Sequence, residues 1–207
     1  MLNNLFPKLF FSGCFYLANV ILQQQLSRHH NPTYKLTRAK LSRNITCFTH
    51  ACLSLFLSGH YQMLFHPGVF YLMTTVSSGY FLFDFFYILK YDPITTFNMV
   101  FLYHHLVALY ILNKGPEYQI YKILFWAELS NIPMYIVYHY LKTDPQGQKV
   151  QIWKQIQKYS YLIIRIPILG YYSYQAYFLS DDKIPFYICL PVYLMGIAWS
   201  AILFNQK

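Results

Sequence analysis

Long blocks of apolar residues, separated by short polar segments, run along the whole chain of 207 residues. Seven such blocks span residues 5–24, 44–65, 68–91, 95–113, 118–141, 159–179 and 184–204. Each block is about 20 residues long, the length of an α-helix that crosses a bilayer. Turn-forming residues lie at several boundaries, namely His66-Pro67-Gly68, Asp92-Pro93 and Asn113-Lys114-Gly115-Pro116. The pattern predicts an all-α, multi-pass membrane protein with about seven transmembrane helices.

Composition agrees with this fold class. Hydrophobic residues make up 56% of the chain and charged residues 11%, whereas a soluble domain carries about 25% charged residues. We expect a first transmembrane helix with its basic loop over residues 1–35 and one membrane-embedded domain over residues 36–205. The first block is expected to be a retained helix, because no small-residue cleavage site follows it. The polar residues 25–43 and 142–158 are expected to be loops.

The net charge of +9 is concentrated between the apolar blocks. If the helices alternate in direction, eleven lysines and arginines fall on one side of the membrane: Arg28, Lys35, Arg38, Lys40, Arg43, Lys90, Lys142, Lys149, Lys154, Lys158 and Lys207. Four fall on the other side, namely Lys8, Lys114, Lys122 and Lys183. The positive-inside rule places the C-terminus in the cytosol, and an endoplasmic reticulum-type or other intracellular membrane is expected. This distribution suits anionic headgroups, so membrane lipids are the expected partners and nucleic acid is not.

Five ionisable residues lie well inside the apolar blocks, where a charge is costly and usually functional. They are Asp84, His104, His105, Glu128 and Arg165. Helical spacing puts Tyr80 on the same face as Asp84. It likewise puts Asn131 and Tyr135 on the same face as Glu128. Polar faces find no partner in lipid, so we expect them to face one another across a shared interior.

Arg165 is expected to pair with an acid. Its depth in its block is similar to that of Asp84 and Glu128, counted at about 1.5 Å per residue. Such a pair has two interpretations, because buried opposite charges can simply hold helices together or can belong to a functional site. The adjacent His104 and His105 favour the site, because two histidines at the depth of these acids are more than packing requires.

Three ordered motifs stand out. They are Ser78-Gly79-Tyr80 with Asp84, then His104-His105, then Glu128-Leu129-Ser130-Asn131-Ile132-Pro133. Together they resemble the TLC family (translocating-chain-associating membrane protein, Lag1 and CLN8) over residues 36–205. The resemblance implies six transmembrane helices in a ring around a central tunnel that opens toward the bilayer, with the first helix outside the ring. The best-known members are ceramide synthases, which transfer an acyl group from acyl-CoA to a sphingoid amine.

The resemblance implies that His104 and His105 are catalytic, as a base or as an acyl-accepting imidazole. An acyl-imidazole is a good acyl donor, and Asp84 or Glu128 would orient the ring and stabilise its cation. Four further residues of the polar faces are candidates for substrate binding, namely Arg165, Asn131, Tyr135 and Tyr80. Acyl-CoA would be a co-substrate, and no metal is expected, because membrane di-iron enzymes need several histidine boxes.

The chain also departs from the ceramide synthases. Their signature continues to a His-Asp-x-Ser-Asp segment, whereas this chain has Glu128-Leu129-Ser130-Asn131. It therefore looks like the broader TLC branch, and functions of different classes stay open. One is acyl transfer to a lipid amine or hydroxyl. The alternative is a non-enzymatic protein that binds or senses lipid or receives cargo, and a proton or ion transporter built on glutamate and histidine also fits.

Overall fold

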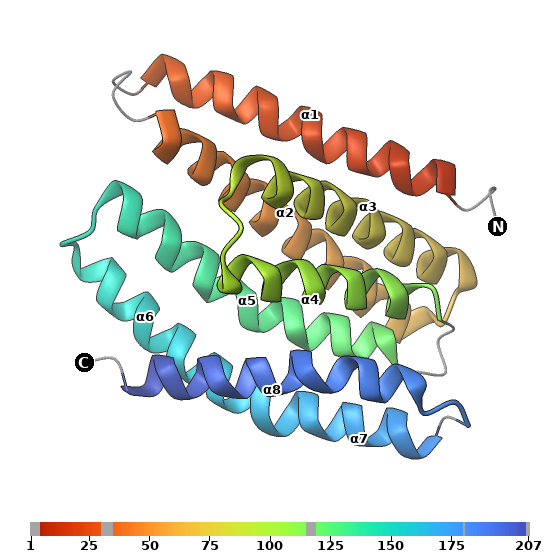
Figure 1. The fold of residues 1–207 in the computed structure, drawn as a ribbon. Coiled ribbons are helices and arrows are strands. Elements are labelled where there is room, and N and C mark those ends of the chain that lie inside the picture. Colours follow the sequence, from red (N-terminus) through yellow and green to blue (C-terminus); the bar gives the residue numbers. More distant parts are fainter. Residues whose placement is uncertain (1–4, 30–34, 115–118, 180, 206–207) are drawn as a thin grey trace.

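The computed structural model describes residues 5–29, 35–114, 119–179 and 181–205, and its secondary structure there is helical throughout (Figure 1). The elements are α1 (Leu5–His29), α2 (Lys35–Leu64), α3 (Pro67–Tyr91), α4 (Thr96–Leu112), α5 (Ile120–Thr143), α6 (Gln148–Ser160), the π-helical η4 (Tyr161–Ile168), α7 (Leu169–Leu179) and α8 (Ile184–Asn205). Because α6, η4 and α7 follow one another without a break, the described residues form seven helical rods. The predicted all-α fold class is confirmed.

Two expected loops are wrong. Residues 25–29 belong to the end of α1 and residues 35–43 to the start of α2, and residues 30–34 of the expected loop lie outside the described residues. Residues 142–158 hold the end of α5, a short turn and most of α6. Hydropathy marks only the apolar part of a helix, whereas backbone hydrogen bonding continues into the charged turns beyond it. The polar ends of the helices were therefore mistaken for loops.

The predicted turn residues cap the helices where the apolar blocks end. His66 is the N-cap of α3, and its Nδ1 accepts from the Gly68 N–H at 3.2 Å. α3 ends one residue before Asp92, which precedes a proline that disfavours helix at that position. Thr95 caps α4 through its hydroxyl oxygen, which accepts from the Asn98 N–H at 3.2 Å. These caps fix the ends of the two helices that carry Asp84 and the histidine pair.

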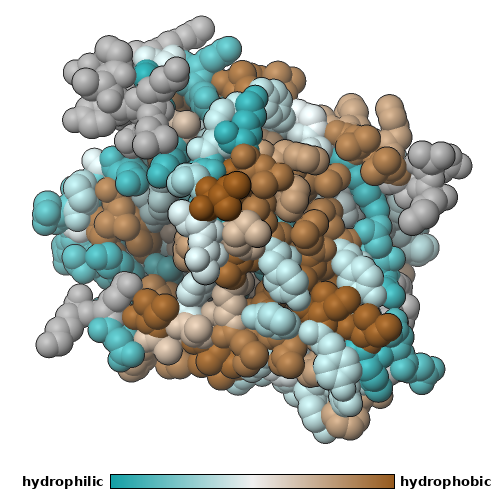
Figure 2. Space-filling model, viewed as in Figure 1, coloured by the Kyte–Doolittle hydropathy of each residue, from teal (hydrophilic) through white to brown (hydrophobic). Residues whose placement is uncertain are grey.

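Among the described residues, three helices are long and apolar enough to cross a membrane: Leu5–Ser27 within α1, Pro67–Tyr91 and Ile184–Asn205. In the apolar windows of the first and last, 11% of residues are buried, whereas 72% are buried in α3. α3 is therefore the interior helix of the three. The surface carries many exposed large apolar side chains, among them Phe10, Phe56, Phe86, Phe97, Phe178 and Leu194. Brown apolar side chains spread over the middle of the face in Figure 2, as a membrane protein requires.

The helices of the described chain contact one another in a closed circuit. α2 packs against α3, α3 against α4, α4 against α8, α8 against η4, η4 against α5, and α5 against α2. α1 lies outside this circuit, against α2 and α3 (Figure 1). α1 and α3 approach closely at Gly79, where an added Cβ would come within 2.5 Å of the Phe11 Cβ and 2.9 Å of the Lys8 carbonyl oxygen. A small residue lets two membrane helices approach this closely.

Successive rods alternate in direction, so their ends gather at opposite sides of the bundle (Figure 1). The α3–α4 and α5–α6 turns lie at the same end as the C-terminal end of α8, and α1 begins at the other end. We call the former the basic end, because Lys90, Lys142 and Lys149 lie in the last or first turns there. The polar site opens toward this end.

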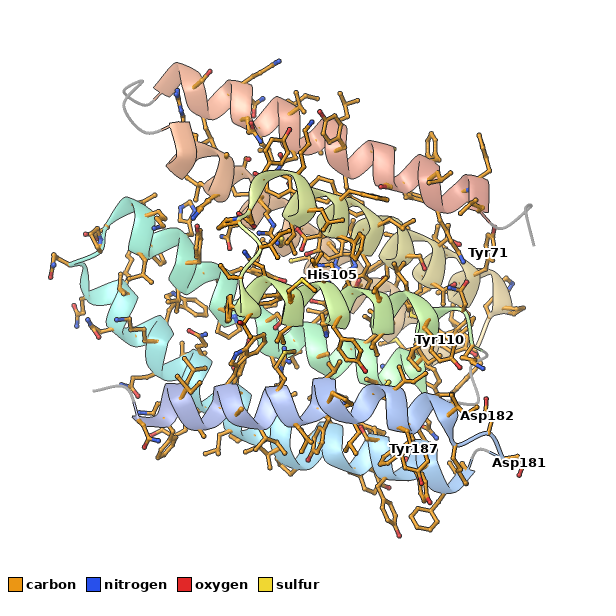
Figure 3. The ribbon with its side chains drawn as sticks, viewed as in Figure 1. Tyr71, His105, Tyr110, Asp181, Asp182 and Tyr187 are labelled. Carbon is orange, nitrogen blue, oxygen red and sulfur yellow. The ribbon has the colours of Figure 1, made fainter. Side chains whose placement is uncertain are left out.

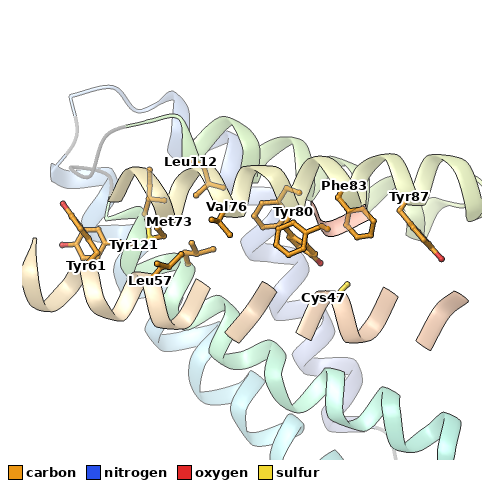
Figure 4. Packing of buried hydrophobic residues seen from close by; sticks show 14 residues of the cluster. Cys47, Leu57, Tyr61, Met73, Val76, Tyr80, Phe83, Tyr87, Leu112 and Tyr121 are labelled. Carbon is orange, nitrogen blue, oxygen red and sulfur yellow. The ribbon is translucent and has the colours of Figure 1, made fainter. Parts of the chain in front are cut away.

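An apolar core runs along α3, from Met73 to Tyr87. Tyr61 of α2 lies 4.9 Å from the Tyr121 ring of α5 and 5.1 Å from the Phe70 ring of α3, measured between ring centroids. Leu57 and Met73 are buried in the same cluster, which Figure 4 shows between the helices. This packing joins α2, α3 and α5, the helices that bring most of the charged side chains to the site.

Candidate functional site

A cavity of about 550 Å³ lies inside the circuit of helices. Its walls come from α2, α3, α4, α5, η4 and α8. All eight residues singled out from the sequence line it, namely Tyr80, Asp84, His104, His105, Glu128, Asn131, Tyr135 and Arg165. Lys40, Asp92 and Asn98 line the part of the cavity nearest the α3–α4 turn, so it reaches the basic end. The structure therefore brings the predicted polar faces together around one interior space.

Asp84 and His105 form the central pair of this site. The His105 Nε2 lies 2.7 Å from the Asp84 Oδ2, and both side chains are buried. Because an ionised carboxylate only accepts hydrogen bonds, this contact places the imidazole proton on Nε2 and leaves a lone pair on Nδ1. The His105 Nδ1 finds no hydrogen-bond partner in the described part of the chain. Figure 3 shows His105 near the middle of the bundle.

Arg43 holds the other side of Asp84. The Arg43 Nε donates to the Asp84 Oδ1 at 2.6 Å, and its Nη2 donates to the Asp84 Oδ2 at 2.9 Å. A third donor, Nη1, reaches the Asp92 Oδ2 at 2.9 Å, and the guanidinium also lies over the Tyr87 ring at 5.2 Å. Two-pronged contacts of this kind are strong and directional. Arg43 therefore fixes the carboxylate that orients His105.

The expected pairing of Arg165 with Asp84 or Glu128 is wrong. No ion pair joins Arg165 to either acid in the described residues. Its Nε donates to the Ser130 hydroxyl oxygen at 2.9 Å, and its Nη2 donates to the Asn131 Oδ1 at 2.5 Å. The carboxylate of Asp84 instead binds Arg43, a residue that was expected to lie in the loop over residues 25–43.

Glu128 meets a different histidine. The Glu128 Oε1 lies 3.6 Å from the Nδ1 of His50, and its Oε2 accepts from the Asn131 amide at 3.2 Å. The His50 ring stacks on Tyr80, with centroids 3.7 Å apart and planes 8° apart, and its Nε2 lies 2.9 Å from the Ser54 hydroxyl. Tyr80 is therefore held flat against the wall by a fully buried histidine.

His104 and His105 do not share one environment. Their ring centroids are 5.6 Å apart and the ring planes differ by 70°. His105 is buried, whereas His104 is half-buried, and the Nδ1 of His104 also lacks a hydrogen-bond partner among the described residues. The Phe81 ring packs edge-on against both imidazoles, at 6.1 Å and 5.4 Å between centroids. Within the described ranges, no group of three or more His, Cys, Asp or Glu residues could hold a metal.

Arg43, His50 and Asp92 belong to the site but were not predicted from the sequence. A signal for the first two was present, because Arg43, Cys47, His50 and Ser54 follow one another at intervals of 4, 3 and 4 residues. That spacing is one face of a helix. Because Arg43 was assigned to the expected loop over residues 25–43, the polar face of α2 was not recognised.

Arg165 and Tyr161 lie in the π-helical η4. The Leu169 N–H bonds to the carbonyl oxygen of Ile164, five residues earlier, as in a π-helix. Pro167 lies inside the segment and has no N–H to donate, which favours the wider turn. Tyr161 donates to the Asn131 Oδ1 at 3.3 Å, and Arg165 stacks over the Tyr161 ring at 4.7 Å.

No protein-family model, curated protein or solved structure matches the chain. Its chemistry is therefore argued from the cavity itself. The cavity combines a carboxylate-bound imidazole with one free nitrogen, a second histidine beside it and a buried guanidinium held by neutral oxygens. Such a set can accept a proton or an acyl group at the imidazole and bind an anionic group at the guanidinium.

Proposed function

We propose that the chain is a membrane enzyme that transfers an acyl group to the amine or hydroxyl of a lipid, with His105 as the base or the acyl acceptor. The observation that carries this proposal is the Asp84–His105 contact at 2.7 Å, which leaves the Nδ1 of this cavity-lining histidine without a hydrogen-bond partner among the described residues. A carboxylate on one ring nitrogen orients the imidazole and stabilises its cation, so the other nitrogen becomes an effective base or nucleophile.

In the acyl-acceptor form, the Nδ1 lone pair attacks the carbonyl carbon of an acyl-CoA thioester and the carbon–sulfur bond breaks. The CoA thiolate leaves, and the imidazole carries the acyl group as a cationic acyl-imidazole. Its proton stays on Nε2, in the hydrogen bond to Asp84. The lipid amine or hydroxyl then attacks the same carbon, Nδ1 leaves, and the proton lost by the nucleophile passes to the thiolate or to solvent. In the base form, Nδ1 takes that proton while the nucleophile attacks the thioester carbon directly. The carbon–sulfur bond then breaks, and the proton passes from Nδ1 to the leaving CoA thiolate.

The membrane arrangement is part of the same proposal. We place all seven rods across the bilayer, with the six helices of the contact circuit around a central tunnel and α1 outside it, as in the TLC family. The basic end faces the cytosol, in an endoplasmic reticulum-type or other intracellular membrane. Support comes from the contact circuit and from the lysines gathered at one end. Single cysteines placed in the α5–α6 turn of a cysteine-free variant should react with an impermeant maleimide only from the cytosolic side.

A non-enzymatic lipid carrier or sensor is the second candidate. The observation that favours it is the Arg43 clamp, because Asp84 is bound on both oxygens as in a structural ion pair. In that case the histidines shape the cavity and no acyl group moves. The two candidates differ in whether a covalent acyl-protein forms.

The test uses the full chain in phosphatidylcholine nanodiscs with radiolabelled palmitoyl-CoA and a sphingoid amine. The wild type is expected to release CoA and form the amide, and His105→Ala should lower the rate about 10²–10⁴-fold, the usual worth of such a group. His60→Ala, at an exposed histidine of α2, should leave the rate unchanged. If lipid binds unmodified and no CoA is released, the proposed acyl transfer is rejected and the carrier or sensor remains. Loss of folding in His105→Ala is checked by thermal denaturation, and His105→Gln replaces it where needed.

A further inference from the structure

Arg165 is a buried cation that has no acidic ion-pair partner among the described residues. Its side chain lies on the cavity wall and is 7% exposed. Two of its nitrogens donate to the neutral oxygens of Ser130 and Asn131. No described residue accepts a hydrogen bond from its third nitrogen, Nη1. A guanidinium has five N–H donors and cannot lose its proton in a protein, so its charge and part of its donor capacity remain unused.

The nearest acid does not neutralise this charge directly. Glu128 approaches the His50 Nδ1 at 3.6 Å and accepts from Asn131, but no oxygen of Glu128 comes within ion-pair distance of Arg165. Asp84 and Asp92 are both taken by Arg43. Glu128 therefore acts on Arg165 only at a distance, and burying a charge without a hydrogen-bonded counter-ion is strongly unfavourable. A charge kept in that state on a cavity wall indicates a partner that enters the cavity.

The residue beside the Arg165 Nη1 is a glycine. A Cβ built on Gly196 of α8 would lie 3.8 Å from the Arg165 Nη1 and 3.4 Å from its Cδ. The absent side chain leaves room at the unused donor. Met195 and Trp199 of the same helix line the cavity next to it, so an apolar wall adjoins the cationic group. A charged head with an attached hydrocarbon chain matches both surfaces.

We infer that Arg165 binds the single negative charge of an amphiphilic lipid, a carboxylate or a phosphodiester, with the lipid's hydrocarbon chain along the α8 wall. A guanidinium fork fits two oxygens of either group. A monoanion is favoured over a dianion because Glu128 lies close to the same amide, Asn131, and a second negative charge would be repelled. The inference rests on the proposed function only in taking the cavity as a lipid site, and it needs no acyl transfer.

Equilibrium binding to the full chain in phosphatidylcholine nanodiscs tests the inference. The probes are palmitate against hexadecanol, which share a chain, and dioleoyl phosphatidylglycerol against dioleoylglycerol, which share two. The wild type should prefer at least one anionic probe over its neutral match by roughly tenfold to a hundredfold, the worth of a charge-assisted hydrogen bond. Preference for palmitate alone identifies a carboxylate ligand, and preference for phosphatidylglycerol alone identifies a phosphodiester.

Arg165→Gln should remove this preference while hexadecanol or dioleoylglycerol still binds. Lys154→Gln, which removes an exposed cation from α6, should keep the preference. Gly196→Val keeps the guanidinium and fills the space beside Nη1, so it should also weaken the anionic probe if Arg165→Gln proves unstable. The preference should persist at high ionic strength, because a buried pair is poorly screened. Equal binding of anionic and neutral probes, or an unchanged preference in both Arg165→Gln and Gly196→Val, would overturn the inference and leave acyl transfer by His105 standing. Failure of every probe to bind would reject the lipid site and the proposed function together.

Discussion

Two arginines reach the same interior and are held in opposite ways. Arg43 donates all three of its nitrogens to the carboxylates of Asp84 and Asp92, at 2.6 to 2.9 Å. Arg165 donates to a hydroxyl and an amide oxygen instead. The Arg43 side chain is 24% exposed, whereas Arg165 is buried, so the better-compensated charge is also the more exposed one. The comparison teaches that the charge of the partner, more than burial, distinguishes a structural ion pair such as the Arg43 clamp from a ligand-binding group such as Arg165.

The difference follows from the helices that carry the two residues. Arg43 lies two turns into α2, where the chain passes the C-terminal turns of α3 at the basic end. Arg165 lies in the middle of the α6–η4–α7 rod, opposite the Ser130-Asn131 pair of α5. Substitutions at the two positions therefore should have different costs and different rescues.

The largest effect is expected at the Arg43 clamp, the ion pair of Arg43 with Asp84 and Asp92. Arg43→Leu leaves Asp84 buried with only His105 as a partner, so the free energy of unfolding should fall by about 3–5 kcal/mol. Adding Asp84→Asn should recover most of this loss, because the unpaired charge is then gone. Thermal denaturation in detergent measures both variants, and Arg38→Leu, at a half-buried arginine on the same helix, is the control. An Arg43→Leu protein as stable as the wild type would show that the Arg43 clamp carries no stability.

A smaller effect is expected at Arg165. Arg165→Leu removes two hydrogen bonds of a charged group to neutral partners, worth about 1.5–3 kcal/mol each at most, but it also removes the burial penalty of the charge. A net loss of about 1–3 kcal/mol is expected, measured by the same denaturation. Neither Asp84→Asn nor Glu128→Gln should rescue it. Rescue by either acid would restore the ion pair that the sequence suggested.

Asn131→Asp makes Arg165 resemble Arg43. The Oδ1 that accepts from Nη2 stays in place and gains a charge, but the new carboxylate replaces the amide that donates to Glu128. The variant is therefore made together with Glu128→Gln, and the fold should then keep its stability to within about 1 kcal/mol. The internal carboxylate should occupy the guanidinium, and the preference for palmitate or phosphatidylglycerol should disappear. The nanodisc binding measurement checks this, with Asn131→Gln as the uncharged control. An Asn131→Asp protein that still selects the anionic probe would separate ligand binding from Arg165.

The smallest effect is expected at the surface. Lys114 and Asp182 approach at 3.3 Å with side chains 28% and 37% exposed. Exposed pairs contribute about 0–1 kcal/mol, so Asp182→Asn should change the denaturation temperature little, and less still at high salt. A loss as large as that of Arg43→Leu would mean that exposure does not govern these ion pairs.

Much of the fold followed from the apolar blocks. The predicted block at 184–204 became Ile184–Asn205, and the block at 95–113 became Thr96–Leu112. His66-Pro67 and Asp92-Pro93 fixed two boundaries because proline restricts the backbone at and before it. The predicted helix ends were wrong where charged residues begin. Hydropathy measures the fit to lipid and says nothing of backbone hydrogen bonds in the charged turns.

The site was predicted as a set of residues but not as a set of contacts. Periodicity told which side chains share a helix face, and all eight reached one cavity. It could not tell which helices are neighbours across that cavity, because those contacts join residues far apart in sequence, such as Arg43 with Asp84 and Ser130 with Arg165. The wrong partner for Arg165 followed directly from this limit.

The π-helical turn around Arg165 has a consequence for how this chain tolerates insertion and deletion. A π segment accommodates one extra residue within an α-helix, because it turns less per residue. Deleting one residue between Tyr161 and Ile168 would therefore return the rod to regular α geometry while α6 and α7 keep their phase, and the contact of Tyr172 with the Lys122 ammonium at 5.4 Å should remain. Within the segment itself, the deletion would change the direction of Arg165. The segment thus lets the side chain on the cavity wall change direction without moving the helix half outside the cavity.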